Sequence, residues 1–143
     1  MTAAEVEALF EQVAPDLDAL ASPWALIGSG ALILLGAPLG EAGDLDVVTN
    51  VEGAGRLRAA WASWLEVGEP KTPDGPFRSD DFARYATPWG PVEVMGGLRV
   101  RGRILDVAGP IPSAAEQLRI LRLFGRPKDL EKAARMEAWL AAG

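Results

Sequence analysis

The chain is 143 residues long, with 49% hydrophobic and 24% charged residues, which is typical of one folded globular domain over residues 1–143. It contains no cysteine and no histidine, which excludes disulfides, thiol nucleophiles, histidine-based triads and the usual zinc sites. A net charge of −6 argues against binding nucleic acid over a broad basic surface. A bound metal is therefore expected to have oxygen ligands, which favours Mg²⁺ or Mn²⁺.

The sequence contains no sign of membrane insertion or export. No apolar run approaches the roughly 18 residues that a membrane-spanning helix requires. Residues 1–20 carry acidic side chains where a signal peptide carries basic ones. We therefore expect a cytoplasmic protein that binds no membrane.

The first part of the chain predicts a helix, a strand and a second helix. Residues 2–5 have the spacing of a capping box, and the apolar positions after them repeat with helical period, so a helix is expected to end near Pro15. Residues 24–27 form a short apolar run that predicts a strand. The glycines and serine of residues 28–30 predict a turn, and residues 31–35 predict a short buried helix.

The middle of the chain continues with a strand and a helix and then with strands alone. Residues 45–49 are rich in β-branched side chains and predict a strand, and residues 52–65 predict a helix. Residues 68–76 are rich in proline and glycine and predict a loop. Three strands with short, antiparallel connections are expected next, at residues 77–86, 92–95 and 98–105.

The C-terminal part predicts a pair of helices. Residues 113–116 form a second capping box, and Gly125 is placed to end the helix that follows. Pro127 suits the first position of a last helix that extends to about Leu140. Taken together, these elements predict an α/β (α+β) fold.

Two aspartates stand at the beginning of the second predicted strand. Because alternate side chains of a strand share a face, Asp44 and Asp46 are expected to project together, with Cα atoms roughly 6.5 to 7 Å apart. Two carboxylates that close repel each other and favour a divalent cation between them. The alternative is that Asp44 is a turn residue after Gly43 and that Asp46 faces solvent.

Small residues precede the predicted helix upstream of these acids. Gly28 and Ser29 would leave backbone N–H groups free at a helix N-terminus, an arrangement that suits a triphosphate. A Rossmann fingerprint is not favoured, because Ile33 stands where that motif requires its third glycine. The alternative is a tight turn that binds no ligand.

A third acid, Glu93, lies between Val92 and Val94 in a predicted strand. If this strand pairs beside the strand of Asp46, three carboxylates converge, enough to hold two ions, or one ion and a general base. The alternatives are that Glu93 faces solvent, as alternate residues of half-exposed strands do, or that Asp106 is the third acid.

The order of these motifs resembles the nucleotidyltransferase superfamily of polymerase-β-like enzymes: Gly-Ser before a helix, Asp-x-Asp on the next strand, and a single acid on a later strand. The segment Gly125-Arg126-Pro127-Lys128-Asp129 is similar to the Arg-x-Lys-Asp segment of the AbiEii toxin-like nucleotidyltransferases and their small bacterial relatives. The resemblance implies a nucleotidyltransferase fold, a small mixed sheet flanked by helices with a C-terminal helical pair.

The resemblance also implies the roles of individual residues. The catalytic, metal-binding acids would be Asp44, Asp46 and Glu93. The nucleotide-binding residues would be Gly28, Ser29, Arg126, Lys128 and Asp129. Such enzymes use Mg²⁺ and a nucleoside triphosphate, and they transfer a nucleoside monophosphate to an RNA, protein or small-molecule acceptor with release of pyrophosphate. The likeness to toxins also implies an antitoxin-like partner protein.

Two further features leave alternatives open. The AbiEii-like pattern has another aspartate after Lys-Asp, which residues 131–133 lack. A catalytically silent module that binds a nucleotide or a partner protein is therefore an alternative function. A structural dimerisation unit is a further alternative.

Arg99, Arg101 and Arg103 are expected to alternate along one strand, where they either face solvent or hold triphosphate or RNA.

Overall fold

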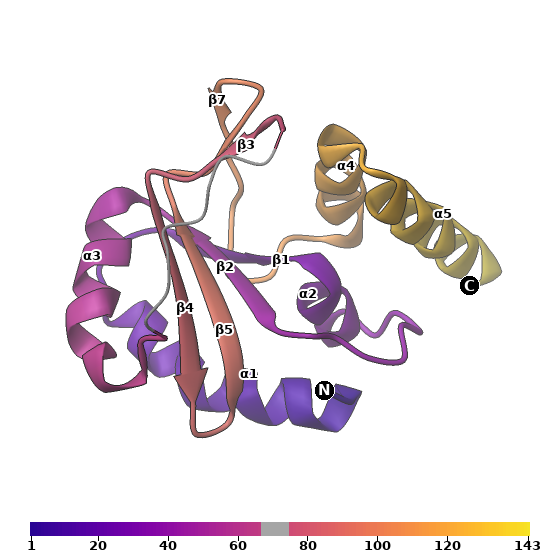
Figure 1. Ribbon diagram of the computed structural model, residues 1–143. Helices are drawn as coiled ribbons and strands as arrows, with labels where there is room; N and C mark the ends of the chain where they lie inside the picture. The colour runs from indigo at the N-terminus through magenta and orange to yellow at the C-terminus, as the bar shows by residue number, and fades with distance from the viewer. Residues whose placement is uncertain (67–74) are drawn as a thin grey trace.

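The computed structural model describes residues 1–66 and 75–143, and a four-stranded mixed sheet forms its centre (Figure 1). In order across this sheet, the strands are β1 (Trp24–Ile27), β2 (Leu45–Thr49), β5 (Gly90–Gly96) and β4 (Asp81–Thr87). Strands β2 and β5 are parallel, whereas β1 pairs with β2, and β4 with β5, in the antiparallel direction. This confirms the expectation of a small mixed sheet.

Helices and a second, smaller sheet surround this centre. The described helices are α1 (Ala3–Asp18), α2 (Gly28–Leu34), α3 (Val51–Ala60), the short 3₁₀ helix Ala62–Trp64, α4 (Ala114–Phe124) and α5 (Pro127–Ala142). The smaller sheet is antiparallel and contains β3 (Phe77–Arg78), β6 (Arg99–Val100) and β7 (Arg103–Ile104). Helices α4 and α5 lie together as the expected C-terminal pair (Figure 1).

The alternation of side chains gives the main sheet two different faces. Leu26, Val47 and Val94 are buried in a large core that the sheet shares with α1 and α3. On the other face, Val48 belongs to a smaller apolar cluster with Ile120 of α4. Because this second cluster is small, most of the core lies on one side of the sheet.

Several predicted boundaries are confirmed, and each has a local cause. The side chain of Ser113 accepts a hydrogen bond from the backbone N–H of Glu116 at 3.2 Å and begins α4. Gly125 adopts the left-handed conformation, with φ of 69°, and ends that helix. Pro127 is the first residue of α5, where its missing N–H costs nothing.

Two predicted strands prove to be wrong as single elements. The expected strand 77–86 is divided into β3 and β4, which belong to different sheets. The expected strand 98–105 is a hairpin of β6 and β7, which turns at Arg101 and Gly102 with φ of 52° and 80°. The side chains of Arg99, Arg101 and Arg103 therefore do not alternate along one strand, because the turn separates them.

Three helical boundaries also differ from expectation. Helix α1 continues past Pro15 to Asp18, because Leu17 is fully buried and its packing offsets the hydrogen bond that proline cannot donate. The predicted helix 52–65 starts one residue earlier and ends at Ala60, and a 3₁₀ turn follows. Residues 28–30 form the first turn of α2 and not a separate turn.

The proline- and glycine-rich loop predicted at residues 68–76 lies outside the described residues except for its last two positions. Over residues 1–66 and 75–143, none of the helices combines the length and the apolar character that crossing a bilayer requires.

Candidate functional site

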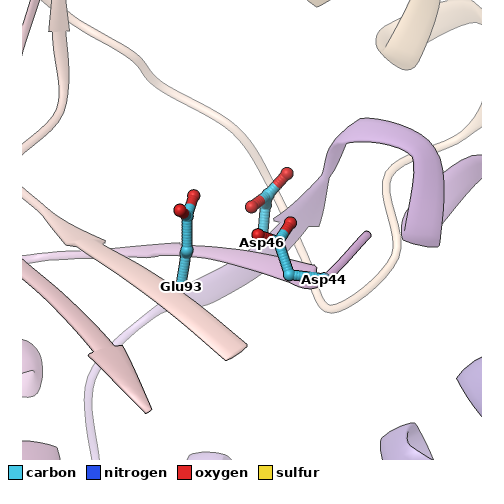
Figure 2. Close-up of side chains that lie close together, drawn as sticks. All are labelled: Asp44, Asp46 and Glu93. Atoms are coloured by element: carbon cyan, nitrogen blue, oxygen red, sulfur yellow. The ribbon is translucent and has the colours of Figure 1, made fainter. Parts of the chain in front are cut away.

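Three carboxylates meet on the second face of the main sheet, at Asp44, Asp46 and Glu93 (Figure 2). One oxygen from each lies within 4.8 Å of the other two. The cause is strand register: β2 and β5 run parallel, and Asp46 is the direct partner of Glu93. This confirms the hypothesis that the strand of Glu93 pairs beside that of Asp46. Asp44 directly precedes β2, and its carboxylate still joins the group.

The rival third acid, Asp106, does not join these carboxylates. It is exposed, and its backbone carbonyl accepts a hydrogen bond from Arg119 of α4. Among the residues that the structure describes, the acids able to share one metal ion are therefore those of β2, β5 and the position before β2.

The position of Asp46 depends on a glycine in α2. Gly28 has φ of 77°, a conformation that side chains disfavour, and a Cβ atom at this position would lie 2.6 Å from Oδ2 of Asp46. Here the Gly-Ser pair of the sequence has a structural reason: the start of α2 packs directly against the carboxylate. Ser29 lines the same cleft as Asp46.

The carboxyl group of Asp46 has the environment of a metal ligand. Its Oδ1 atom is buried and has no hydrogen-bond partner. Burial, and then the charges of Asp44 and Glu93, raise the pKa of Asp46 well above its ordinary value. A hard divalent cation would relieve both the unpaired oxygen and the charge repulsion. It would bind the Oδ1 atom that has no hydrogen-bond partner and offset the negative charge of the three acids. These residues therefore fit a divalent metal ion.

Arg84 of β4 also reaches this group, and sequence reasoning did not find it. Its Nη1 atom lies 3.1 Å from Oδ2 of Asp44 and 2.5 Å from Oε1 of Glu93. Arg84 is the cross-strand partner of Glu93, so the two side chains share a face. The role of Arg84 follows from the pairing register of β4 with β5. The sequence gives no signal for that register before both strands are placed.

The carboxylates line a cleft of about 570 Å³. Its walls come from elements that are distant in sequence, including α2, β2, β3, β5, α4 and α5. Basic residues line it too: Arg78, Arg126, Lys128 and Lys132. The cleft therefore combines an acidic group with several cations, an arrangement that suits a metal-bound polyanion.

The two cleft lysines stand four residues apart on α5, so Lys128 and Lys132 share one side of the helix. Within the described part of the chain, neither lysine has a carboxylate within ion-pair distance. Lys132 is a cleft residue that sequence reasoning missed, although its helical spacing from Lys128 could have indicated it.

The other two residues of the C-terminal motif bind each other. Asp129 is 2% exposed and accepts hydrogen bonds from Nε and Nη2 of Arg126, at 2.5 and 3.1 Å. The guanidinium of Arg126 also lies 4.7 Å from the ring centre of Phe77, which contacts Phe124 edge to face. Both charged residues line the cleft, and their mutual pairing stabilises the start of α5.

Gln117 is a further buried polar residue of the cleft lining, and it was not predicted. It is 1% exposed, and its Nε2 atom donates a hydrogen bond to the carbonyl oxygen of Leu26 at 3.0 Å. This contact joins α4 to β1 beside the carboxylates, so the helix pair is held in place against the sheet.

Comparison with known proteins bears on the fold. No protein-family model matches the chain, and no curated protein matches it. Among solved structures, it is similar to a crystal structure described as a "putative nucleotidyltransferase" from Thermotoga maritima. The TM-score is 0.71 with 21% sequence identity, and the match covers 100% of this chain and 97% of the other. The chain therefore has the fold of a nucleotidyltransferase-like structure, with three carboxylates gathered on its sheet.

Proposed function

We propose that the protein is a Mg²⁺- or Mn²⁺-dependent nucleotidyltransferase that moves a nucleoside monophosphate from a nucleoside triphosphate to a hydroxyl group. The observation that carries this proposal is the convergence of Asp44, Asp46 and Glu93, with a buried oxygen of Asp46 left without a partner. The nucleotidyltransferase-like fold supports the same conclusion.

The carboxylates would hold the metal, and the basic residues of the cleft would hold the phosphates. When bound, a divalent cation supplies charge that stabilises the transferred phosphoryl group. Lys128 and Lys132 are available to the phosphates, because no carboxylate in the described residues neutralises them. Gly28 has no Cβ atom and so leaves room for the carboxylate of Asp46. Gly28 and Ser29 line the cleft beside this carboxylate, where the phosphates would bind next to the metal.

The acceptor hydroxyl must lose a proton during transfer. The side chains of Asp44 and Glu93 are 21% and 19% exposed, so each presents an edge to the cleft that a hydroxyl can reach. The Oδ1 atom of Asp46, in contrast, is buried without a hydrogen-bond partner, which suits a metal ligand better than a group that a hydroxyl must reach. We therefore assign proton acceptance to Asp44 or Glu93, and metal binding to all three acids.

We extend the proposal to the acceptor and the partner. An RNA, a protein or a small molecule with a free hydroxyl fits the chemistry. Because Arg126, Lys128 and Asp129 line the cleft, they support a relation to the AbiEii toxin-like enzymes, and with it an antitoxin-like partner. Co-purification of the tagged protein from its own cells tests the partner, and a chain that elutes alone contradicts it.

The activity can be tested by labelling. The protein is incubated with each labelled nucleoside triphosphate, Mg²⁺, and either total RNA or cell protein, and transfer of the label is measured. Asp46→Asn is expected to abolish labelling, whereas Asp106→Asn, which removes an exposed acid outside the group, retains it. Labelling that is equal in the wild type and in Asp46→Asn would contradict the proposal.

One observation favours a second candidate, a catalytically silent module that binds a nucleotide or a partner. Arg84 already pairs with both Asp44 and Glu93 through its Nη1 atom and offsets part of their negative charge. Calorimetry separates the two functions: nucleotide binding that is unaffected by Mg²⁺ and by Asp46→Asn favours the silent module, and binding that requires both favours the enzyme.

A further inference from the structure

Arg84 occupies the position where a cation is needed. Its guanidinium is permanently charged and donates to Glu93 of β5 and to Asp44, which directly precedes β2. It reaches Asp44 and Glu93 but not Asp46, whose Oδ1 atom has no hydrogen-bond partner. The arginine therefore pairs with two of the three acids, offsets part of their charge with its single positive charge, and leaves the third acid unsatisfied.

A third carboxylate partner of Arg84, Glu66, lies outside the group of three acids. The Nε atom of Arg84 lies 3.6 Å from Oε2 of Glu66, whose side chain is 47% exposed. Glu66 is held there by its backbone, because its N–H donates a hydrogen bond to the carbonyl of Arg84 at 2.9 Å. The guanidinium thus already has a partner outside the group of three acids, which it can keep when it leaves Asp44 and Glu93.

A divalent cation and this guanidinium repel each other if both bind the acids at the same time. Both are positive, and both use oxygens of Asp44 and Glu93. The Arg84 side chain is 40% exposed and sits on the edge strand of the sheet, so it has space to turn outward. The ion pair in place is consequently a state that metal binding must displace.

Resting on the metal site proposed above, we infer that Arg84 is an internal counter-ion that competes with the divalent cation. It closes the carboxylate site when no ion is bound and shifts to Glu66 when one binds. The apparent affinity for the ion is then the intrinsic affinity of the three acids multiplied by the fraction of molecules in which Arg84 has left them. Arg84 and Glu66 are positioning residues that set the metal affinity.

The test is direct Mn²⁺ binding without nucleotide, by calorimetry or by the electron paramagnetic resonance signal of free Mn²⁺. Arg84→Gln is expected to tighten Mn²⁺ binding by about tenfold, within the usual range of coupling between sites. The matched control is Arg58→Gln, since Arg58 is also 40% exposed and pairs with Asp81 at 2.5 Å, away from the three acids. Arg58→Gln is expected to leave the affinity within about twofold of wild type.

Glu66→Gln provides a second test, on a residue whose side chain is 47% exposed and whose backbone hydrogen bond to Arg84 does not depend on its carboxylate. It removes the alternative partner of Arg84 and is expected to weaken Mn²⁺ binding several-fold. This effect is expected to vanish when Glu66→Gln is combined with Arg84→Gln, because there is then no guanidinium to redirect. If Glu66→Gln weakens Mn²⁺ binding equally in the wild type and in Arg84→Gln, the cause is the lost negative charge of Glu66 itself. That result would overturn the role of Glu66 as a partner of Arg84.

The outcomes separate this inference from the proposed function. Unchanged or weaker Mn²⁺ binding in Arg84→Gln, with Asp46→Asn abolishing binding, overturns the role of Arg84 and keeps the metal site. Absence of Mn²⁺ binding in both the wild type and Arg84→Gln overturns both proposals. Binding that appears only in Arg84→Gln supports competition in its strongest form.

Discussion

At the scale of single residues, Gly28 has the clearest structural requirement in the site. Its backbone is left-handed, and its missing Cβ leaves the space that Oδ2 of Asp46 occupies. Both properties are needed at once, because an alanine would add conformational strain and a contact of 2.6 Å.

We predict that Gly28→Ala lowers the free energy of unfolding by more than about 2 kcal/mol and weakens Mn²⁺ binding. Gly102→Ala is the control, since Gly102 has a similar φ of 80° and no atom within 4 Å of the added Cβ. It is expected to cost only about 1 kcal/mol, from backbone strain, with no effect on the metal. Urea unfolding and calorimetry measure both effects, and equal losses in the two variants would contradict the contact with Asp46.

The raised pKa of Asp46 predicts how stability depends on pH in the absence of metal. Because the folded state binds this proton more tightly than the unfolded state, ionised Asp46 destabilises the fold above its raised pKa. The penalty decreases as the pH falls through that pKa and is lost near pH 4, where the unfolded group also becomes protonated.

In EDTA, Asp46→Asn is therefore expected to be more stable than the wild type at neutral pH, by on the order of 1 kcal/mol or more, since one pKa unit corresponds to about 1.4 kcal/mol. The advantage shrinks towards pH 4. Urea unfolding at several pH values measures it, with Asp106→Asn as the control. A difference that stays constant from neutral to acid pH speaks against the buried, charged environment of Asp46.

Residues of the site differ in how far the sequence predicts them. Asp46 and Glu93 interrupt apolar strands, where acids are disfavoured, and Asp44 is visible because it stands two residues before Asp46. Arg84 is not visible in this way, because an arginine in a half-exposed strand is ordinary and its role depends on lying opposite Glu93. Pairing between strands is a tertiary property that alternation alone does not determine.

At the scale of elements, the first turn of α5 separates a structural pair from binding residues. Arg126 and Asp129 bind each other, whereas Lys128, between them in sequence, lines the cleft and forms no ion pair with any of the described residues. Neighbouring charged residues of one motif are therefore expected to behave differently on substitution.

Asp129→Asn is expected to lower the free energy of unfolding by about 1 to 3 kcal/mol, because it weakens hydrogen bonds to a charged group that is nearly buried. The matched control is Glu137→Gln on the same helix, which breaks the exposed pair with Arg122 and should cost less than about 1 kcal/mol. Thermal unfolding compares the two. A smaller cost for Asp129→Asn than for Glu137→Gln would show that the buried pair does not stabilise α5.

Lys128→Ala and Lys132→Ala are expected to leave stability unchanged and to weaken binding of a non-hydrolysable triphosphate by about tenfold each, as for loss of a hydrogen bond to a charged group. Arg135→Ala removes the same charge from the exposed part of α5 and serves as the control. Calorimetry with Mg²⁺ measures the affinities. If the three variants lose affinity equally, overall charge is responsible and the cleft lysines have no direct contact.

The elements themselves were predictable where local signals agree. Strands β1 and β2 and helix α4 have the expected ends, because glycine, proline and capping residues mark them in the sequence. The hairpin of β6 and β7 was not predicted, since its turn begins with Arg101 in a left-handed conformation that arginine seldom adopts. The division between β3 and β4 was also missed, because it depends on which sheet each strand joins.

At the scale of the whole molecule, the two faces of the main sheet differ: one packs against the large core, and the other carries the candidate site. One face carries most of the apolar core, and the other carries Asp46, Glu93 and Arg84 together with the smaller cluster that includes Ile120 of α4. The contact of Phe77 with Phe124 joins the smaller sheet to the C-terminal helix pair. The cleft is therefore built from parts that only the complete fold brings together.

The metal site can be observed by diffraction from crystals grown with Mn²⁺ and a non-hydrolysable nucleoside triphosphate. We expect an anomalous peak bonded to oxygens of Asp44, Asp46 and Glu93, with the phosphates between that peak and Lys128. A triphosphate in the cleft without Mn²⁺ at these three acids, or Mn²⁺ bound elsewhere, would contradict this expectation.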